Sequence, residues 1–143
     1  MTRPAAALPL LLLLAACNGQ PDDLPGGEDT RPYAGIAEGD RLRFTGTEPF
    51  WGGEVRGTAL RFSTAEEPDG RSITVTRFAG RGGASWSGEL DGTPFTLLAS
   101  EGTCSDGMSD RTYPFSVTVQ RGSQMLSGCG WTDARPFAGP EAP

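Results

Sequence analysis

Apolar and polar residues alternate with a period of two through most of residues 41–132. Leu42 and Phe44 are separated by Arg43, and the same spacing returns at Ile73 and Val75. Successive side chains of a strand point to opposite faces of a sheet, so this pattern predicts half-buried strands with one polar face in solvent. A polar outer face argues against a transmembrane barrel, whose outer face is apolar.

Turn signals separate these alternating runs. Asp91-Gly92 is the strongest, because Asp-Gly suits the type I′ turn of a two-residue hairpin. The other turn signals are Gly52-Gly53, Gly57, Pro68-Asp69-Gly70, Gly80 to Gly83 and Gly122-Ser123. About seven or eight short strands at this spacing predict an all-β domain, either a small antiparallel β-barrel or a sandwich.

The N-terminus has the composition of a targeting segment. Arg3 supplies one positive charge, and residues 5–16 are almost wholly apolar. A charged start followed by a short apolar run is typical of a secretory signal, and the run is too short to cross a ~30 Å hydrocarbon core as a helix. We therefore expect residues 1–16 to be a signal peptide.

The apolar run ends in Leu14-Ala15-Ala16-Cys17, which resembles the lipobox of bacterial lipoproteins. The resemblance implies that the signal is removed and that Cys17 becomes the lipidated first residue of the mature chain, commonly with palmitate. Several acyl chains, at ~0.8 kcal/mol per buried CH₂, make a stable anchor. Asn18 follows the cysteine, and by the same resemblance the expected location is the periplasmic face of the outer membrane.

Residues 17–40 and 133–143 have a different composition from the alternating region. The first segment carries six acidic residues against Arg31 alone, together with several prolines and glycines. Such a segment buries too little apolar surface to offset chain entropy, so we expect a disordered acidic tether. The second segment contains Pro136, Pro140 and Pro143 and is expected to be a flexible tail. The β domain is then residues 41–132.

The composition excludes several function classes. The chain contains no histidine, which removes His-based triads, imidazole acid–base catalysis and His-ligated metal sites. Its formal net charge of -6 argues against electrostatic binding to nucleic acid. We therefore expect no cofactor, no metal site and no enzymatic activity.

Two cysteines remain once Cys17 is assigned to lipid. An even pair in an oxidising compartment predicts a disulfide between Cys104 and Cys129. Closing a loop of about 25 residues contributes about 3–3.5 kcal/mol to stability, which matters for so small a core.

Three short blocks carry a resemblance to a known family. They read GTEPFW from residue 46, CSDGMSDRTYPF from residue 104 and LSGCG from residue 126. Together they resemble a family of uncharacterised bacterial envelope lipoproteins, some of which are associated with META-type domains. The resemblance implies a small β domain in the cell envelope and no established reaction.

The second block combines two carboxylates, two hydroxyls and a guanidinium in residues 105–111. One interpretation is structural. Asp and Ser side chains accept backbone N–H groups in turns, and Gly107 permits a positive φ. Arg111 can then pair with Asp106 or Asp110. A loop built in this way and stapled by a disulfide needs no ligand.

The same residues also allow functional interpretations. Asp106 and Asp110 could bind Ca²⁺, although the acidic density of a calcium loop is missing and no bidentate Glu follows. Together with Glu48 they could supply the carboxylate pair of a glycan hydrolase. Arg111 and the aspartates could instead contact a protein or a small ligand.

The aromatic residues of the first block have two interpretations of their own. Phe50 and Trp51 could enter a strand and fill the end of a barrel. Alternatively, Trp51 could form an exposed aromatic patch with Trp131 that binds a partner.

The function expected from these observations is that of a membrane-anchored envelope lipoprotein with a non-enzymatic periplasmic β domain, for binding or structural work. The expected partners are the membrane, through the lipid anchor, and a protein or glycan. The candidate binding residues are Glu48, Trp51, Asp106, Asp110, Arg111 and Trp131.

Three alternatives stand beside this function. Membrane-bound inhibitors of c-type lysozyme resemble this chain in architecture alone, as small disulfide-bearing β-barrel lipoproteins, which makes inhibition of host lysozyme one alternative. A carboxylate-dependent glycan hydrolase is another. A lipocalin-like carrier is disfavoured, because the alternating aromatic residues are numerous enough to fill a small barrel.

Overall fold

The computed structural model describes residues 31–141, which belong to one compact unit running from Arg31 to Pro143. The expected signal peptide, the lipidation site at Cys17 and the first part of the expected tether lie outside the described residues. Residues 31–141 contain no helix long and apolar enough to span a bilayer.

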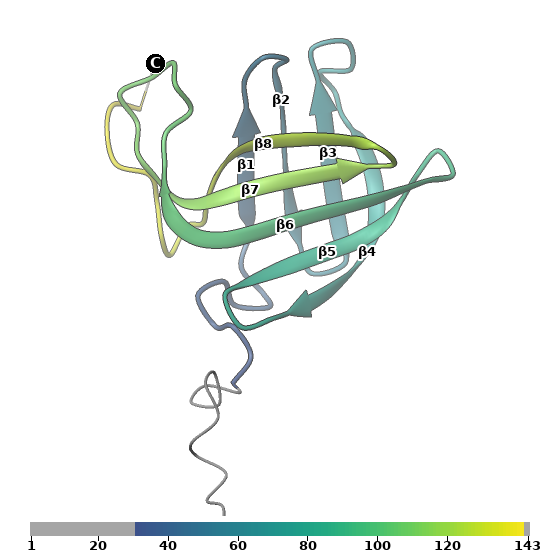
Figure 1. Ribbon diagram of the computed structural model, residues 1–143, viewed down its shortest axis with the longest axis horizontal. Coiled ribbons are helices and arrows are strands. Elements are labelled where there is room, and N and C mark those ends of the chain that lie inside the picture. The colour runs from purple at the N-terminus through teal and green to yellow at the C-terminus, as the bar shows by residue number, and fades with distance from the viewer. Residues whose placement is uncertain (1–30, 142–143) are drawn as a thin grey trace, which may run out of the picture. The chain divides into compact units, whose positions relative to one another are not determined.

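Eight antiparallel strands form a closed barrel in which each strand pairs with the next and the last pairs with the first. The all-β class is confirmed, and of the two architectures expected the barrel is the correct one. The first three strands cross the last four at a steep angle (Figure 1). The strands are β1 (Leu42–Gly46), β2 (Trp51–Arg56), β3 (Ala59–Thr64), β4 (Arg71–Ala79), β5 (Gly83–Leu90), β6 (Thr93–Cys104), β7 (Tyr113–Arg121) and β8 (Gln124–Trp131).

The inward-facing residues of the alternating runs form a single core. A chain of ring contacts runs through part of it. Trp51 lies between Phe44 and Phe62, with ring centroids 6.0 and 6.2 Å away, and Phe62 meets Phe95 at 5.2 Å. These aromatic rings fill the barrel over this part of its length, as the alternation predicts.

The hairpin expected at Asp91-Gly92 is confirmed. Leu90 pairs with Thr93, and the two residues between them have φ angles of 52° and 76°. Two consecutive positive φ values are those of a type I′ turn, whose twist matches that of the flanking strands.

The disulfide between Cys104 and Cys129 is also present, with a Cα–Cα distance of 5.6 Å. It joins the end of β6 to β8, the two strands that flank β7. The strands, the core and the disulfide all lie within residues 31–141, so we expect the compact unit from Arg31 to Pro143 to fold on its own.

The expected boundary at residue 40 is placed too late in the chain. Ile36 is fully buried in the core, and the backbone N–H of Tyr33 donates to the Gly80 carbonyl at 2.7 Å. The Arg77 guanidinium donates to the Ile36 carbonyl at 2.7 Å and lies over the Trp86 ring. The segment shows no apolar alternation, so composition alone missed this closure of the lower end of the barrel (Figure 1).

The expected flexible tail at residues 133–143 is likewise packed over the part that the structure describes. Phe137 meets the rings of Tyr113 and Trp131 at 5.7 and 5.6 Å. Thr112 and Ala138 exchange backbone hydrogen bonds of 2.9 and 2.8 Å. The segment therefore lies against the β6–β7 loop, where its partly buried aromatic ring contributes packing that offsets the entropy cost of ordering a proline-rich chain.

Candidate functional site

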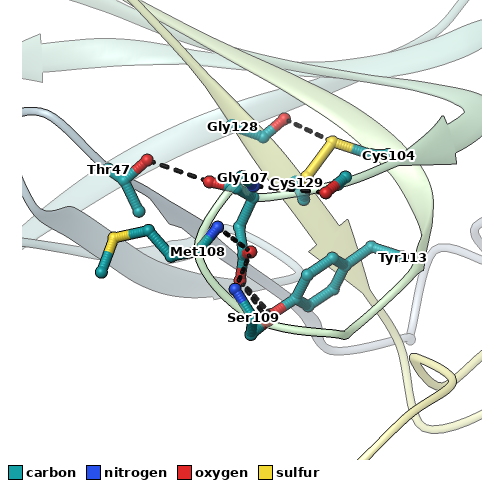
Figure 2. Close-up of a disulfide and its surroundings, with 10 residues drawn as sticks. Thr47, Cys104, Gly107, Met108, Ser109, Tyr113, Gly128 and Cys129 are labelled. Carbon is teal, nitrogen blue, oxygen red and sulfur yellow. Dashed lines mark hydrogen bonds between the residues drawn. A yellow bond between two sulfur atoms is a disulfide. The ribbon is translucent and has the colours of Figure 1, made fainter. Parts of the chain in front are cut away.

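The three sequence blocks meet at one place on the barrel. The Thr47 hydroxyl of the first block donates to the Asp106 carbonyl of the second at 3.1 Å. The disulfide connects the second block to the third, and Cys104 Sγ lies 3.3 Å from the Gly128 carbonyl oxygen (Figure 2). Residues far apart in the sequence are thus held together by one hydrogen bond and one disulfide.

The Asp106 carboxylate organises the β6–β7 loop from within. Its Oδ1 accepts the backbone N–H groups of Met108 and Ser109 at 3.0 and 2.8 Å. Its Oδ2 accepts the Ser109 and Tyr113 hydroxyls at 2.7 and 3.1 Å. These hydrogen bonds, chiefly those from the Ser109 and Met108 backbones, lower the pKa of Asp106 from 3.8 to about 2.

Four donors occupy the roughly four lone-pair positions that a carboxylate offers. Asp106 is therefore an ionised structural acceptor with little capacity left for a cation or a substrate. The structural interpretation of this loop holds for the turn that Asp106 caps, and Gly107 has the positive φ of 73° expected of it. Among residues 31–141, no three His, Cys, Asp or Glu side chains lie close enough to hold a metal ion.

Arg111 does not make the ion pair expected with Asp106 or Asp110. Its guanidinium donates to the backbone carbonyls of Pro140, at 2.7 Å, and Glu141. It also lies 4.4 Å from the centre of the Phe137 ring. The C-terminal segment supplies partners that are distant in sequence, so the expected pairing of Arg111 with the nearby aspartates is wrong.

A pocket of about 220 Å³ opens where the three blocks meet, and we call it the motif pocket. Two apolar side chains on its rim are largely exposed, Phe50 at 56% and Met108 at 64%. The lining residues are Thr45, Thr47, Phe50, Asp106, Met108, Ser109, Arg111, Tyr113 and Trp131.

Three of the six candidate residues line the motif pocket and three do not. Asp106, Arg111 and Trp131 are present, whereas Glu48 and Asp110 are exposed outside it. The three carboxylates of the proposed hydrolase are therefore not gathered in this pocket.

Trp51 is the clearest correction among the candidate residues. It is only 5% exposed and belongs to the core, so it cannot form a surface patch with Trp131. Because Trp51 starts β2 facing inward, its neighbour Phe50 remains in the turn and is exposed. The sequence held a signal for this arrangement, since consecutive residues at a strand entry point to opposite sides.

Replacing Asp106 by Asn should lower the free energy of unfolding by about 2 kcal/mol at neutral pH, because an amide cannot accept all four donors. Urea unfolding measures the loss. Asp110→Asn removes the same charge from the same loop, but this exposed residue should change stability by less than about 0.5 kcal/mol. Equal losses in the two variants would contradict the role given to Asp106.

The pH dependence of the same experiment follows from the lowered pKa. A carboxyl with a lowered folded-state pKa adds stability above its ordinary value of 3.8, and that contribution disappears as the pH falls through about 2. The difference in unfolding free energy between the wild type and Asp106→Asn should therefore shrink steadily as the pH falls from about 5 to about 2. A difference that stays constant over this range would contradict the lowered pKa.

Comparisons of this chain with family models, curated proteins and solved structures find no match.

Proposed function

We propose that this chain is a lipid-anchored cell-envelope protein whose β domain binds a partner protein through the motif pocket without catalysing a reaction. The observation that carries the proposal is the convergence of three separate sequence blocks on one pocket with exposed apolar residues at its rim. Exposed apolar clusters rimmed by polar groups are typical of protein interaction sites.

The size of the motif pocket supports a protein partner. Pockets that enclose small-molecule ligands measure about 300–1,000 Å³, and this one measures about 220 Å³. A single apolar side chain of a partner fits such a volume. The wall contains Trp131, Tyr113 and Met108, and these residue types are enriched at protein interfaces.

The state of Asp106 supports binding rather than catalysis. A general acid of a glycan hydrolase needs a pKa raised toward neutrality, whereas the pKa of Asp106 is lowered to about 2. Asp106 is thus occupied in shaping the pocket, since it holds Ser109 and Tyr113 in place.

The anchoring part of the proposal rests on the sequence, because Cys17 lies outside the described residues. A lipid at Cys17 would hold the domain near a membrane surface, where a partner in the same membrane is met at a high effective concentration. The packed domain begins near Tyr33, so the connecting segment is shorter than the composition suggests.

Photo-crosslinking in living cells tests this proposal. A photoreactive amino acid replaces Met108 in the full chain, and we expect a discrete adduct of higher mass after irradiation. Met125 provides a matched control position, because it is the same residue type, is 66% exposed and lies outside the motif pocket. Absence of an adduct from position 108, or identical adducts from both positions, would refute the proposed interface.

The same cells test the anchor. The wild-type chain should incorporate labelled palmitate and fractionate with membranes, and Cys17→Ser should do neither. Label that persists in Cys17→Ser would rule out lipidation at this residue.

A further inference from the structure

The barrel is closed at one end and open at the other. Ile36 and Arg77 close the lower end. At the opposite end a cavity of about 350 Å³, which we call the mouth cavity, leads toward the core. Its lining residues are Pro49, Phe50, Trp51, Phe62, Thr64, Glu66, Glu67, Leu90, Arg121, Gln124 and Leu126.

The floor of the mouth cavity is apolar. Trp51, Phe62 and Leu90 are buried core residues that line its inner side, and Leu126 packs partly buried against the core beside them. The mouth of a β-barrel is one of the usual places for a small-molecule site, because strand ends surround an apolar interior there.

Arg121 brings a positive charge to this apolar cavity. The inward row of β7 contains Tyr113, Phe115, Val117 and Val119, all buried, and Arg121 is the next position of that row. The period of two therefore directs Arg121 to the interior side, where it lies partly buried at the end of the barrel. Among residues 31–141 its guanidinium has no hydrogen-bond or ion-pair partner.

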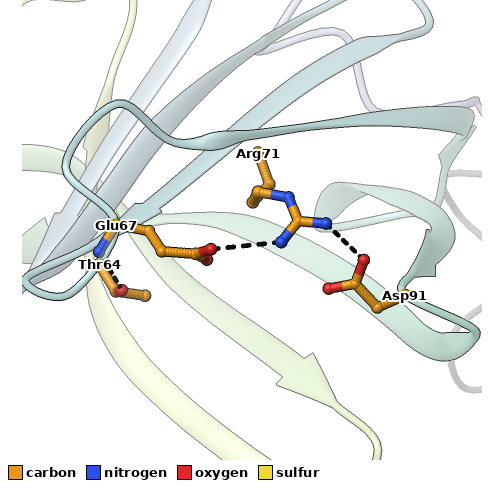
Figure 3. A network of polar contacts seen from close by, with 4 residues as sticks. All are labelled: Thr64, Glu67, Arg71 and Asp91. Carbon is orange, nitrogen blue, oxygen red and sulfur yellow. Dashed lines mark hydrogen bonds and ion pairs between the residues drawn. The ribbon is translucent and has the colours of Figure 1, made fainter.

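The acidic residues at the rim do not neutralise this cation. Glu67 is paired with Arg71 at 3.2 Å, and Arg71 also binds Asp91 at 2.5 Å, which connects the β3–β4 turn to the β5–β6 turn (Figure 3). Glu66 is exposed and makes no ion pair with Arg121. Exposed carboxylates are screened by water, and Arg121 is the one basic side chain among the described residues that line the cavity.

We propose that the mouth cavity binds a small organic carboxylate, with its aliphatic body on the apolar floor and its carboxylate on Arg121. An Arg guanidinium suits this group because its planar fork donates two parallel hydrogen bonds to a carboxylate. Its volume of about 350 Å³ falls within the range of about 300–1,000 Å³ of small-molecule pockets and suits a ligand the size of a medium-chain fatty acid.

This site is distinct from the motif pocket and does not depend on the proposed function. Among the described residues, Phe50 is the one that lines both. Met108, from which the partner protein is to be crosslinked, does not line the mouth cavity. The two proposals can therefore fail separately.

Calorimetric titration of the unit from Arg31 to Pro143 tests the site, with octanoate as the probe. Octan-1-ol serves as a neutral probe with the same chain. We expect saturable binding of octanoate, weakened about tenfold in Arg121→Gln, while octan-1-ol binding changes by less than about twofold. Arg61→Gln is the matched control, because this exposed arginine of β3 does not line the cavity.

A second variant tests whether the aliphatic chain of the probe binds in the mouth cavity. Leu126→Trp places a larger ring in the cavity and should abolish binding of both probes. Failure of the wild type to bind octanoate, or unchanged octanoate binding in Arg121→Gln or in Leu126→Trp, would overturn the proposal. Because Arg121 has no partner to lose, its variant is expected to unfold at the same temperature as the wild type.

Discussion

Replacing Cys104 and Cys129 together by serine is expected to lower the free energy of unfolding by about 3.5 kcal/mol. The two cysteines are separated by 25 residues, and closing a loop of that length raises the free energy of the unfolded chain by about this much. The loss is large for a small domain, because a total stability of about 5–15 kcal/mol is usual.

Urea unfolding of the oxidised wild type, the reduced wild type and the double variant measures this effect. The reduced wild type and the double variant should agree within about 1 kcal/mol. Cys17→Ser is the control, because it removes the cysteine that does not take part in the disulfide and should leave the unfolding midpoint unchanged. A double variant as stable as the oxidised wild type would contradict a stabilising bridge.

Loss of the disulfide should also affect the motif pocket. The bridge fixes the start of the β6–β7 loop against β8, and the Asp106 carbonyl of that loop accepts a 3.1 Å hydrogen bond from Thr47. Without the bridge, Met108 is held by the loop's own hydrogen bonds to Asp106. We therefore expect weaker crosslinking from position 108 in the double variant under conditions in which it remains folded.

The strands could be predicted from the sequence because their burial is a local property. Alternating apolar and polar residues indicate a strand with one buried face. The Asp91-Gly92 pair indicates a hairpin, because both residues readily adopt the positive φ values of a type I′ turn. The disulfide could be predicted by elimination, since only two cysteines remained.

The terminal segments could not be predicted in the same way. Ile36 and Phe137 lie in short segments rich in proline, glycine, alanine and charged residues, and no periodic pattern marks them. Their packing depends on partners that are distant in sequence, such as the barrel core for Ile36 and Tyr113 and Trp131 for Phe137. These partners come together only in the folded tertiary structure.

The candidate site was only partly predictable for a similar reason. Asp106 acts locally, on residues two, three and seven positions later, so its turn could be foreseen from the sequence. Arg111 acts over a distance, through residues at the C-terminus. Arg121 could have been placed on the inward face from the alternation of β7, but the sequence does not say that this end of the barrel stays open.

Replacing Gly128 by Ala is expected to destabilise the domain by about 3 kcal/mol, at the upper end of the usual cost of overpacking. A Cβ at this position would lie 2.2 Å from the Thr45 carbonyl oxygen and 2.9 Å from the Trp51 ring. The carbonyl belongs to the backbone of β1, so the clash cannot be relieved by a side-chain rotation. β1 and β8 pair only over Arg43 to Thr45, and this short seam closes the barrel.

Gly102→Ala is the matched control for this substitution. Gly102 also lies in a strand near the disulfide, but the atom nearest to an added Cβ there, Ser116 Oγ, would be 3.7 Å away, an ordinary contact. Thermal and urea unfolding should separate the two variants by more than about 2 kcal/mol. Equal stability would mean that β1 and β8 can move apart to accommodate the added Cβ without a large loss of stability. The glycine of the third sequence block would then be explained by something other than barrel closure.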